Sequence, residues 1–127
     1  MLQIKVTVAR ACVMPATLRH CLGEIFGDAI DEVEVIVAIP MVAWHFGPGI
    51  LGATTRRRKI FINFPCEQFW DDPQLVLHEY YHVIQQWGRE RMTIPGYLFR
   101  FWIKEREARE FAARHRPKLE QCLLKAG

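Results

Sequence analysis

The sequence predicts an α+β protein with a short mixed or antiparallel sheet, because strand-like and helix-like hydrophobic patterns occupy separate parts of the chain. Residues 2–10 alternate between apolar and polar side chains, and residues 32–39 are rich in β-branched ones, as strands are. Most of the chain after residue 71 shows helical patterns instead. A chain of 127 residues has the size of a single domain, 1–127.

The first half of the chain predicts three strands and one helix. After the strand at 2–10, Pro15 begins an amphipathic helix, since proline is well placed in a first helical turn. The strand at 32–39 is followed by an irregular stretch with several glycines. Residues 56–64 then predict a third strand, with basic residues at its start.

The second half predicts two long antiparallel helices. Residues 71–73 form a helix-start signal, an acidic N-cap followed by proline, and the helix that they begin runs to about Trp87. A loop leads to the next helix, from residue 97 to about residue 115. Pro117 predicts the end of that helix, and a short terminal helix or frayed tail follows.

Composition and charge limit the kinds of partner and the cellular compartment that we expect for this chain. No apolar run approaches the roughly 20 residues that cross a bilayer, and the first residues lack the pattern of a signal peptide. The net charge is +3, but residues 104–116 interleave both signs, which is typical of a solvated helix face. We therefore expect no membrane and no nucleic-acid partner. A cytoplasmic location is the default, unless the chain is exported without the usual signal.

The cysteines are scattered, with no CxxC pair to indicate a metal site or a local disulfide. Together with the missing signal peptide, this spacing favours reduced and mostly buried thiols over a disulfide framework. The cysteines in question are Cys12, Cys21, Cys66 and Cys122.

The segment HEYYH, residues 78–82, carries the strongest functional signal. On a helix, His78 and His82 lie one turn apart on the same face, so both imidazoles can bind one Zn²⁺ ion. Glu79 then lies where it can accept a proton from water activated by the metal. The structural alternative is a pair of buried histidines satisfied by hydrogen bonds. The apolar character of this helix weakens that alternative, because burying these polar groups without a partner would be costly.

The following helix offers the third metal ligand. Glu107 lies in the middle of an apolar stripe, with Ile103 and Phe111 about 40° to either side of it. Glu105 points nearly the opposite way, and we expect it to be solvated. Glu110 lies at the flank of the stripe, where it can support a histidine. Glu107 is therefore the preferred third ligand, and Glu110 is the alternative.

Together, HEYYH and the later EAREFA, residues 107–112, resemble the gluzincin metallopeptidases. In that family, the HExxH helix and a later helix supply His, His and Glu as zinc ligands. Gln85 and Gln86 add a resemblance to the HExxHxxQQ variety of small bacterial zincin-like domains. The resemblance covers residues 56–112. It implies a small zincin-like domain whose sheet packs on the active-site helix and on a following antiparallel helix.

The resemblance also implies an activity, namely zinc-dependent hydrolysis of peptide bonds with Glu79 as the general base. The strand Arg56–Phe64 corresponds to the edge strand along which these enzymes bind a peptide or protein substrate. Tyr97 corresponds to the donor that stabilises the oxyanion, although a tyrosine here is equally consistent with a core role. Phe111 stands where thermolysin-like enzymes have an aspartate that supports a histidine. This departure keeps open a catalytically silent zinc-containing binding or scaffold domain.

Overall fold

The computed structural model describes residues 10–37, 53–56, 58–89 and 101–126. The elements in chain order are β1 (Arg10–Ala11), α1 (Ala16–Phe26), the 3₁₀ helix η1 (Gly27–Glu32), β2 (Glu34–Val37), β3 (Ala53–Arg56), β4 (Lys59–Ile62), α3 (Cys66–Trp70), α4 (Pro73–Tyr81), the π-helix η2 (His82–Arg89) and α6 (Phe101–Ala126). The α+β class is confirmed. Within these ranges, every helix is too short or too polar to pass through a lipid bilayer.

The sheet is mixed, as the sequence predicts, with the strand order β1-β2-β4-β3. β2 runs parallel to β4, whereas β1 and β3 are antiparallel to their neighbours. The predicted strand 56–64 is divided between two elements, because Arg56 ends β3 and β4 begins at Lys59. β4 pairs with a strand on each side, so it is an interior strand. The prediction of an edge strand over 56–64 is therefore wrong for β4, and β3 lies at the edge of the described sheet.

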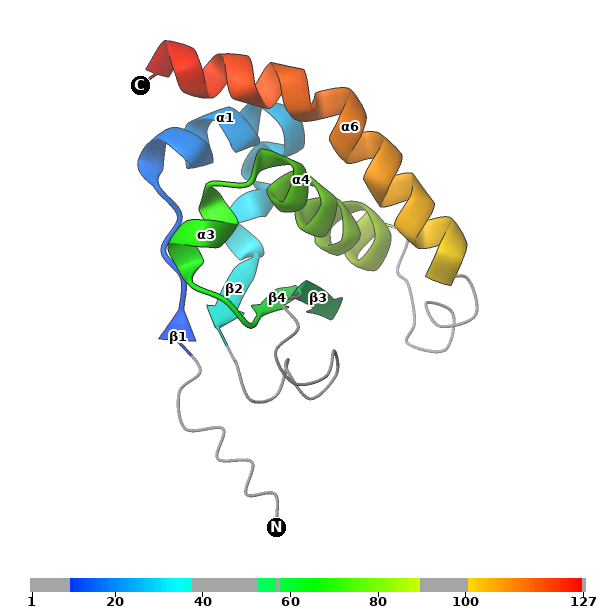
Figure 1. Ribbon diagram of the computed structural model, residues 1–127. Coiled ribbons are helices and arrows are strands. Elements are labelled where there is room, and N and C mark those ends of the chain that lie inside the picture. Colours follow the sequence, from blue (N-terminus) through cyan, green and yellow to red (C-terminus); the bar gives the residue numbers. More distant parts are fainter. Residues whose placement is uncertain (1–9, 38–52, 57, 90–100, 127) are drawn as a thin grey trace.

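The helix that carries the HEYYH segment begins where the sequence predicts. The Asp72 side chain accepts a hydrogen bond from the Leu75 amide at 3.1 Å, which satisfies one of the free N–H groups of the first turn. The helix α4 continues directly into η2, where the hydrogen bonding widens to the π pattern. π-Helical segments are rare and often occur at functional sites. In Figure 1, α4 lies between the sheet on one side and α1 and α6 on the other.

The last helix differs from the prediction, because α6 runs through Pro117 to Ala126. Proline lacks an N–H group and cannot bond to the carbonyl one turn earlier, so it usually kinks or ends a helix. Here the exposed Pro117 is flanked by the fully buried Ala112 and Leu119, which fasten the helix on both sides of it. Figure 1 shows α6 as one helix that bends along its length. The predicted start at Tyr97 lies outside the described residues.

The prediction of reduced thiols is wrong, because the cysteines form two disulfides. Cys12 is bonded to Cys66 and Cys21 to Cys122, across sequence separations of 54 and 101 residues. Neither pairing could be read from local spacing, because the fold brings together residues far apart in the chain. The second disulfide joins α1 to the last turns of α6.

Candidate metal centre

The two histidines of the HEYYH segment face each other at the junction of α4 and η2. Their ring centroids are 4.8 Å apart, and their Nε2 atoms are separated by 3.2 Å. The His82 side chain is almost completely buried, at 2% exposure, while His78 keeps 17%. The helical spacing of four residues therefore brings the two nitrogens together, as the sequence predicts.

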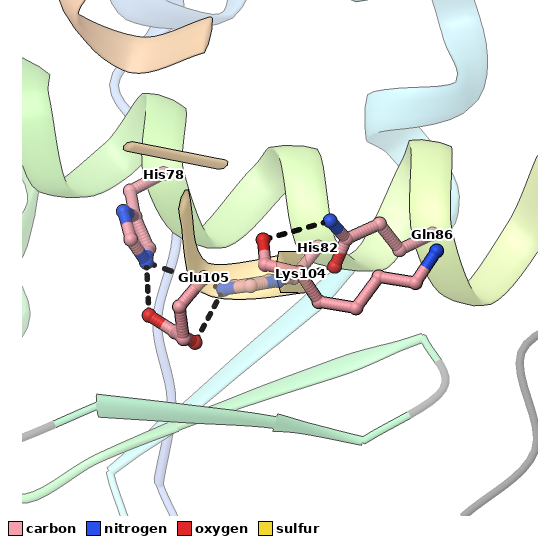
Figure 2. Close-up of polar contacts among 5 residues, drawn as sticks. All are labelled: His78, His82, Gln86, Lys104 and Glu105. Atoms are coloured by element: carbon pink, nitrogen blue, oxygen red, sulfur yellow. Dashed lines mark hydrogen bonds and ion pairs between the residues drawn. The ribbon is translucent and has the colours of Figure 1, made fainter. Parts of the chain in front are cut away.

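The carboxylate that joins them belongs to Glu105, in the first turns of α6. One carboxylate oxygen, Oε2, lies 3.0 Å from His78 Nε2, and the other, Oε1, lies 2.9 Å from His82 Nε2. Figure 2 shows the carboxylate directed at both imidazole rings. The Glu105 side chain is 21% exposed, so the cluster is partly shielded but retains access to solvent.

The geometry of these three groups fits a small divalent metal. Ligands bound tetrahedrally to zinc at roughly 2.0–2.1 Å lie about 3.3 Å from one another. Here the two Nε2 atoms are 3.2 Å apart, and each lies 2.9 or 3.0 Å from a different oxygen of the same carboxylate. Two imidazole nitrogens and one carboxylate oxygen are also the donor set of many catalytic zinc sites.

Hydrogen bonds alone satisfy this arrangement poorly. An ionised carboxylate only accepts hydrogen bonds, so each Nε2 must donate its single hydrogen to Glu105. No hydrogen then remains for the contact between the two Nε2 atoms, which are 3.2 Å apart. A cation bound by all three groups removes this conflict.

The structure brings Glu105 to the histidines rather than Glu107. The prediction that Glu105 is solvated is wrong, because its carboxylate contacts both rings. Glu107 is half-buried elsewhere on the helix and is not part of the cluster of potential ligands, and Glu110 is exposed. Tyr97 lies outside the described residues.

The reason for this difference is the face that α6 presents to α4. Phe111 packs against Tyr81 of α4, but Ile103 is 47% exposed, so the stripe centred on Glu107 is not the packed face along its whole length. The packed face instead carries Ala108 and Ala112, both fully buried. Small side chains let two helices approach closely, and Glu105 lies on the same stripe, three and seven residues before these alanines. This small-residue stripe is the sequence signal that could have identified Glu105.

Glu79 is buried beside the cluster, with only 6% of its surface exposed. Burial raises the pKa of its carboxyl group, and the repulsion of Glu105 adds to this, although the charges of His82 and His78 act in the opposite direction. In the part of the chain that the structure describes, no donor hydrogen-bonds to Glu79. The carboxyl group therefore lies close enough to the cluster to feel its charges and has a raised affinity for a proton.

The charges of the cluster are coupled to its burial. Burial raises the pKa of Glu105, but the hydrogen bonds from His78 and His82 outweigh burial and hold the pKa of this carboxyl group well below its usual range. Burial lowers the pKa of His82, but Glu105, Glu79 and Gln86 together outweigh it, and the pKa of His82 is raised. Glu105 is therefore ionised at neutral pH, as a metal ligand must be.

A second layer of contacts extends from His82. Its Nδ1 atom lies 2.6 Å from Gln86 Oε1, and Gln86 Nε2 donates to the backbone carbonyl of Lys104 at 2.9 Å. The supporting contact that the sequence analysis assigned to Glu110 is thus made by Gln86. Phe111 packs against the rings of Tyr81 and Phe26.

Comparison with known proteins gives no assignment. The chain matches no family model, and it has no significant similarity to a curated protein or to a solved structure. The geometry of the described residues is therefore the basis on which a function can be proposed.

Proposed function

We propose that the chain is a zinc-dependent metallopeptidase in which His78, His82 and Glu105 bind the metal and Glu79 is the general base. The observation that carries the proposal is the convergence of two imidazole nitrogens and a carboxylate within 3.2 Å of one another, beside a buried carboxyl group. The resemblance of the HEYYH segment to gluzincins supports the same activity. Glu105 replaces Glu107, the ligand predicted from the sequence, as the proposed third ligand.

The residues of the site have distinct roles in this proposal. Bound zinc supplies Lewis acidity, which makes water a competent nucleophile near neutral pH and polarises a carbonyl group. The Glu79 carboxylate accepts a proton from the attacking water and passes it to the leaving amine nitrogen. Burial raises the pKa of the Glu79 carboxyl group, which increases its affinity for the proton of the attacking water. Tyr97 remains the proposed donor to the oxyanion.

An extended peptide is the proposed substrate, and β3 is the strand along which it would bind. β3 lies at the edge of the described sheet and contacts both α4 and η2. A peptide in extended conformation can add to such an edge through backbone hydrogen bonds. Arg58 and Lys59, both exposed at the start of β4, would favour acidic groups in the substrate.

The disulfides change the expected compartment. Disulfides are rare in reducing cytosol and persist in oxidising environments such as the periplasm or the extracellular space. The two disulfides of this chain therefore favour an oxidising compartment over the cytoplasmic location expected from its sequence.

The proposal is tested by measuring zinc content and peptide hydrolysis in one set of variants. Glu105→Gln should weaken zinc binding severely, because it removes the charged ligand. Glu107→Gln, two residues along the same helix, is the matched control and should bind zinc as the wild type does. Glu79→Gln should retain zinc and lower kcat by about 10²–10⁴-fold, the usual contribution of a general base.

The outcomes separate the possible functions. A wild-type protein that takes up no stoichiometric zinc rules out the metal site. Zinc binding that depends on Glu105, without hydrolysis of any peptide in a mixed library, would instead indicate a catalytically silent zinc-containing binding domain. Loss of zinc in Glu107→Gln but not in Glu105→Gln would restore the ligand predicted from the sequence.

A further inference from the structure

Gln86 is a fully buried amide whose two ends are both hydrogen-bonded. Its Nε2 atom lies 2.9 Å from the carbonyl oxygen of Lys104, and its Oε1 atom lies 2.6 Å from His82 Nδ1. A backbone carbonyl can only accept a hydrogen bond, so the NH₂ end of the amide must face Lys104. The oxygen end therefore faces His82, as Figure 2 shows.

This orientation requires a hydrogen on one nitrogen of the His82 ring, Nδ1. The amide oxygen only accepts hydrogen bonds, so His82 Nδ1 must carry the hydrogen that they share. Without a metal, Nε2 also carries a hydrogen, which it donates to Glu105. When a metal replaces that hydrogen, the hydrogen held on Nδ1 leaves the Nε2 lone pair for the metal. Nε2 is the atom that lies 2.9 Å from Glu105 and 3.2 Å from His78 Nε2, at the centre of the cluster.

The same amide also acts on the opposite helix. Lys104 directly precedes Glu105, so the bond from Gln86 to the Lys104 carbonyl holds the backbone next to the carboxylate ligand. Gln86 thus touches one ligand directly and the residue adjacent to another. The Gln86 amide therefore connects η2 to α6 directly beside the cluster of His78, His82 and Glu105.

We propose that Gln86 is a positioning residue for the metal site, which presents the Nε2 lone pair of His82 to the metal and sets the level of Glu105 on α6. This inference rests on the proposed zinc site and deepens it. Residues that hydrogen-bond the outer nitrogen of a histidine ligand typically change metal affinity by about 10–100-fold when they are removed.

The first experiment compares zinc affinities, measured by competition with a chromophoric chelator. Gln86→Met keeps the length and approximate volume of the side chain but removes both hydrogen bonds, and it should weaken zinc binding by about 10–100-fold. Gln85→Met is the matched control, because it makes the same replacement at the half-buried neighbouring position, and its affinity should equal that of the wild type. Gln86→Glu restores the acceptor for His82 but not the bond to Lys104, so it should recover part of the lost affinity.

The second experiment reads the ring form directly and needs no metal. In ¹⁵N-labelled, zinc-free wild-type protein, long-range ¹H–¹⁵N correlation spectra should show a hydrogen on His82 Nδ1, shielded from exchange. The signal should be lost in Gln86→Met and kept in Gln85→Met. A purely structural role for Gln86 would not change how the hydrogen on Nδ1 is protected from exchange, so this readout separates positioning from packing.

The results distinguish this inference from the proposed function. If the wild type binds zinc and Gln86→Met binds it equally well, the positioning role is overturned while the zinc site stands. Equal losses in Gln86→Met and Gln85→Met would also overturn it. A wild-type spectrum without hydrogen on His82 Nδ1 would do so even if Gln86→Met failed to fold. A wild type that binds no zinc removes the proposed function itself.

Discussion

Among the described residues, two groups of potential metal ligands lie along α6, one at its contact with α4 and one at its contact with α1. The first consists of His78, His82 and Glu105. Its side chains are 17%, 2% and 21% exposed, and their donor atoms point at a common centre. Its side chains are held by packing on both helices, so little conformational entropy would be lost if they bound an ion.

The second group consists of His20, Glu24 and Cys122, whose potential ligand atoms also lie within 4.8 Å of one another. The His20 and Glu24 side chains are 70% and 50% exposed, so solvent competes for them and holding them in place costs conformational entropy. The sulfur of Cys122 is bonded to Cys21, and metals bind the thiolate form of cysteine.

The difference teaches that proximity alone does not make a metal site. The ligand atoms of each group lie within 4.8 Å of one another, but only the first group combines burial with a supporting contact from Gln86. One helix therefore serves two purposes. Its first turns supply Glu105, the proposed third ligand, and its last turns are joined covalently to α1.

The largest expected effect comes from removing one histidine from each group. His82→Ala should abolish stoichiometric zinc binding, because it deletes a ligand and leaves Glu105 without its closest partner. His20→Ala should leave zinc stoichiometry unchanged. Metal analysis of the dialysed proteins measures both. Equal zinc loss in the two variants would mean that the second group also binds metal, and the contrast drawn between them would fail.

A smaller effect should follow from removing the disulfide beside the second group. The double variant Cys21→Ala, Cys122→Ala frees a loop of about 100 residues, which should lower the free energy of unfolding by about 2–5 kcal/mol. Urea unfolding followed by circular dichroism measures this change. Zinc affinity should fall much less than in His82→Ala, because Ala108 and Ala112 still pack α6 on α4. Detection of reactive thiols in the native wild-type protein would contradict the bond itself.

How much of this arrangement the sequence predicts depends on the range of the interactions. The start of α4 and the pairing of His78 with His82 are local, since a cap or a helical turn involves residues within four positions. These predictions are confirmed. The disulfides are not local: their cysteines are 54 and 101 residues apart, and no short-range pattern brings them together.

The third ligand shows the same limit in another form. Choosing among Glu105, Glu107 and Glu110 required knowing which face of the helix is packed, and large apolar side chains were the guide. The face of α6 that approaches α4 at the level of Glu105 carries Ala108, while Ile103 remains half exposed. The edge strand was misplaced for a related reason, since the neighbours of β4 are set by the whole sheet.

The smallest effect tests this close approach of the two helices. Ala112→Leu places a larger side chain in a fully buried position between α6 and the core, which should lower the free energy of unfolding by about 1–3 kcal/mol. The same change at the exposed neighbour, Ala113→Leu, should alter it by less than about 0.5 kcal/mol. Chemical denaturation measures the two values.

The same pair of variants also tests how Glu105 is held. Ala112 lies seven residues after Glu105 on the packed stripe, so forcing α6 away from α4 should draw the carboxylate away from both Nε2 atoms. Zinc affinity should therefore fall in Ala112→Leu and stay unchanged in Ala113→Leu. If Ala112→Leu is destabilised but binds zinc as tightly as the wild type, the metal site does not depend on the close approach at this position. The hydrogen bond from Gln86 to the Lys104 carbonyl would then have to hold Glu105 beside the histidines without help from Ala112.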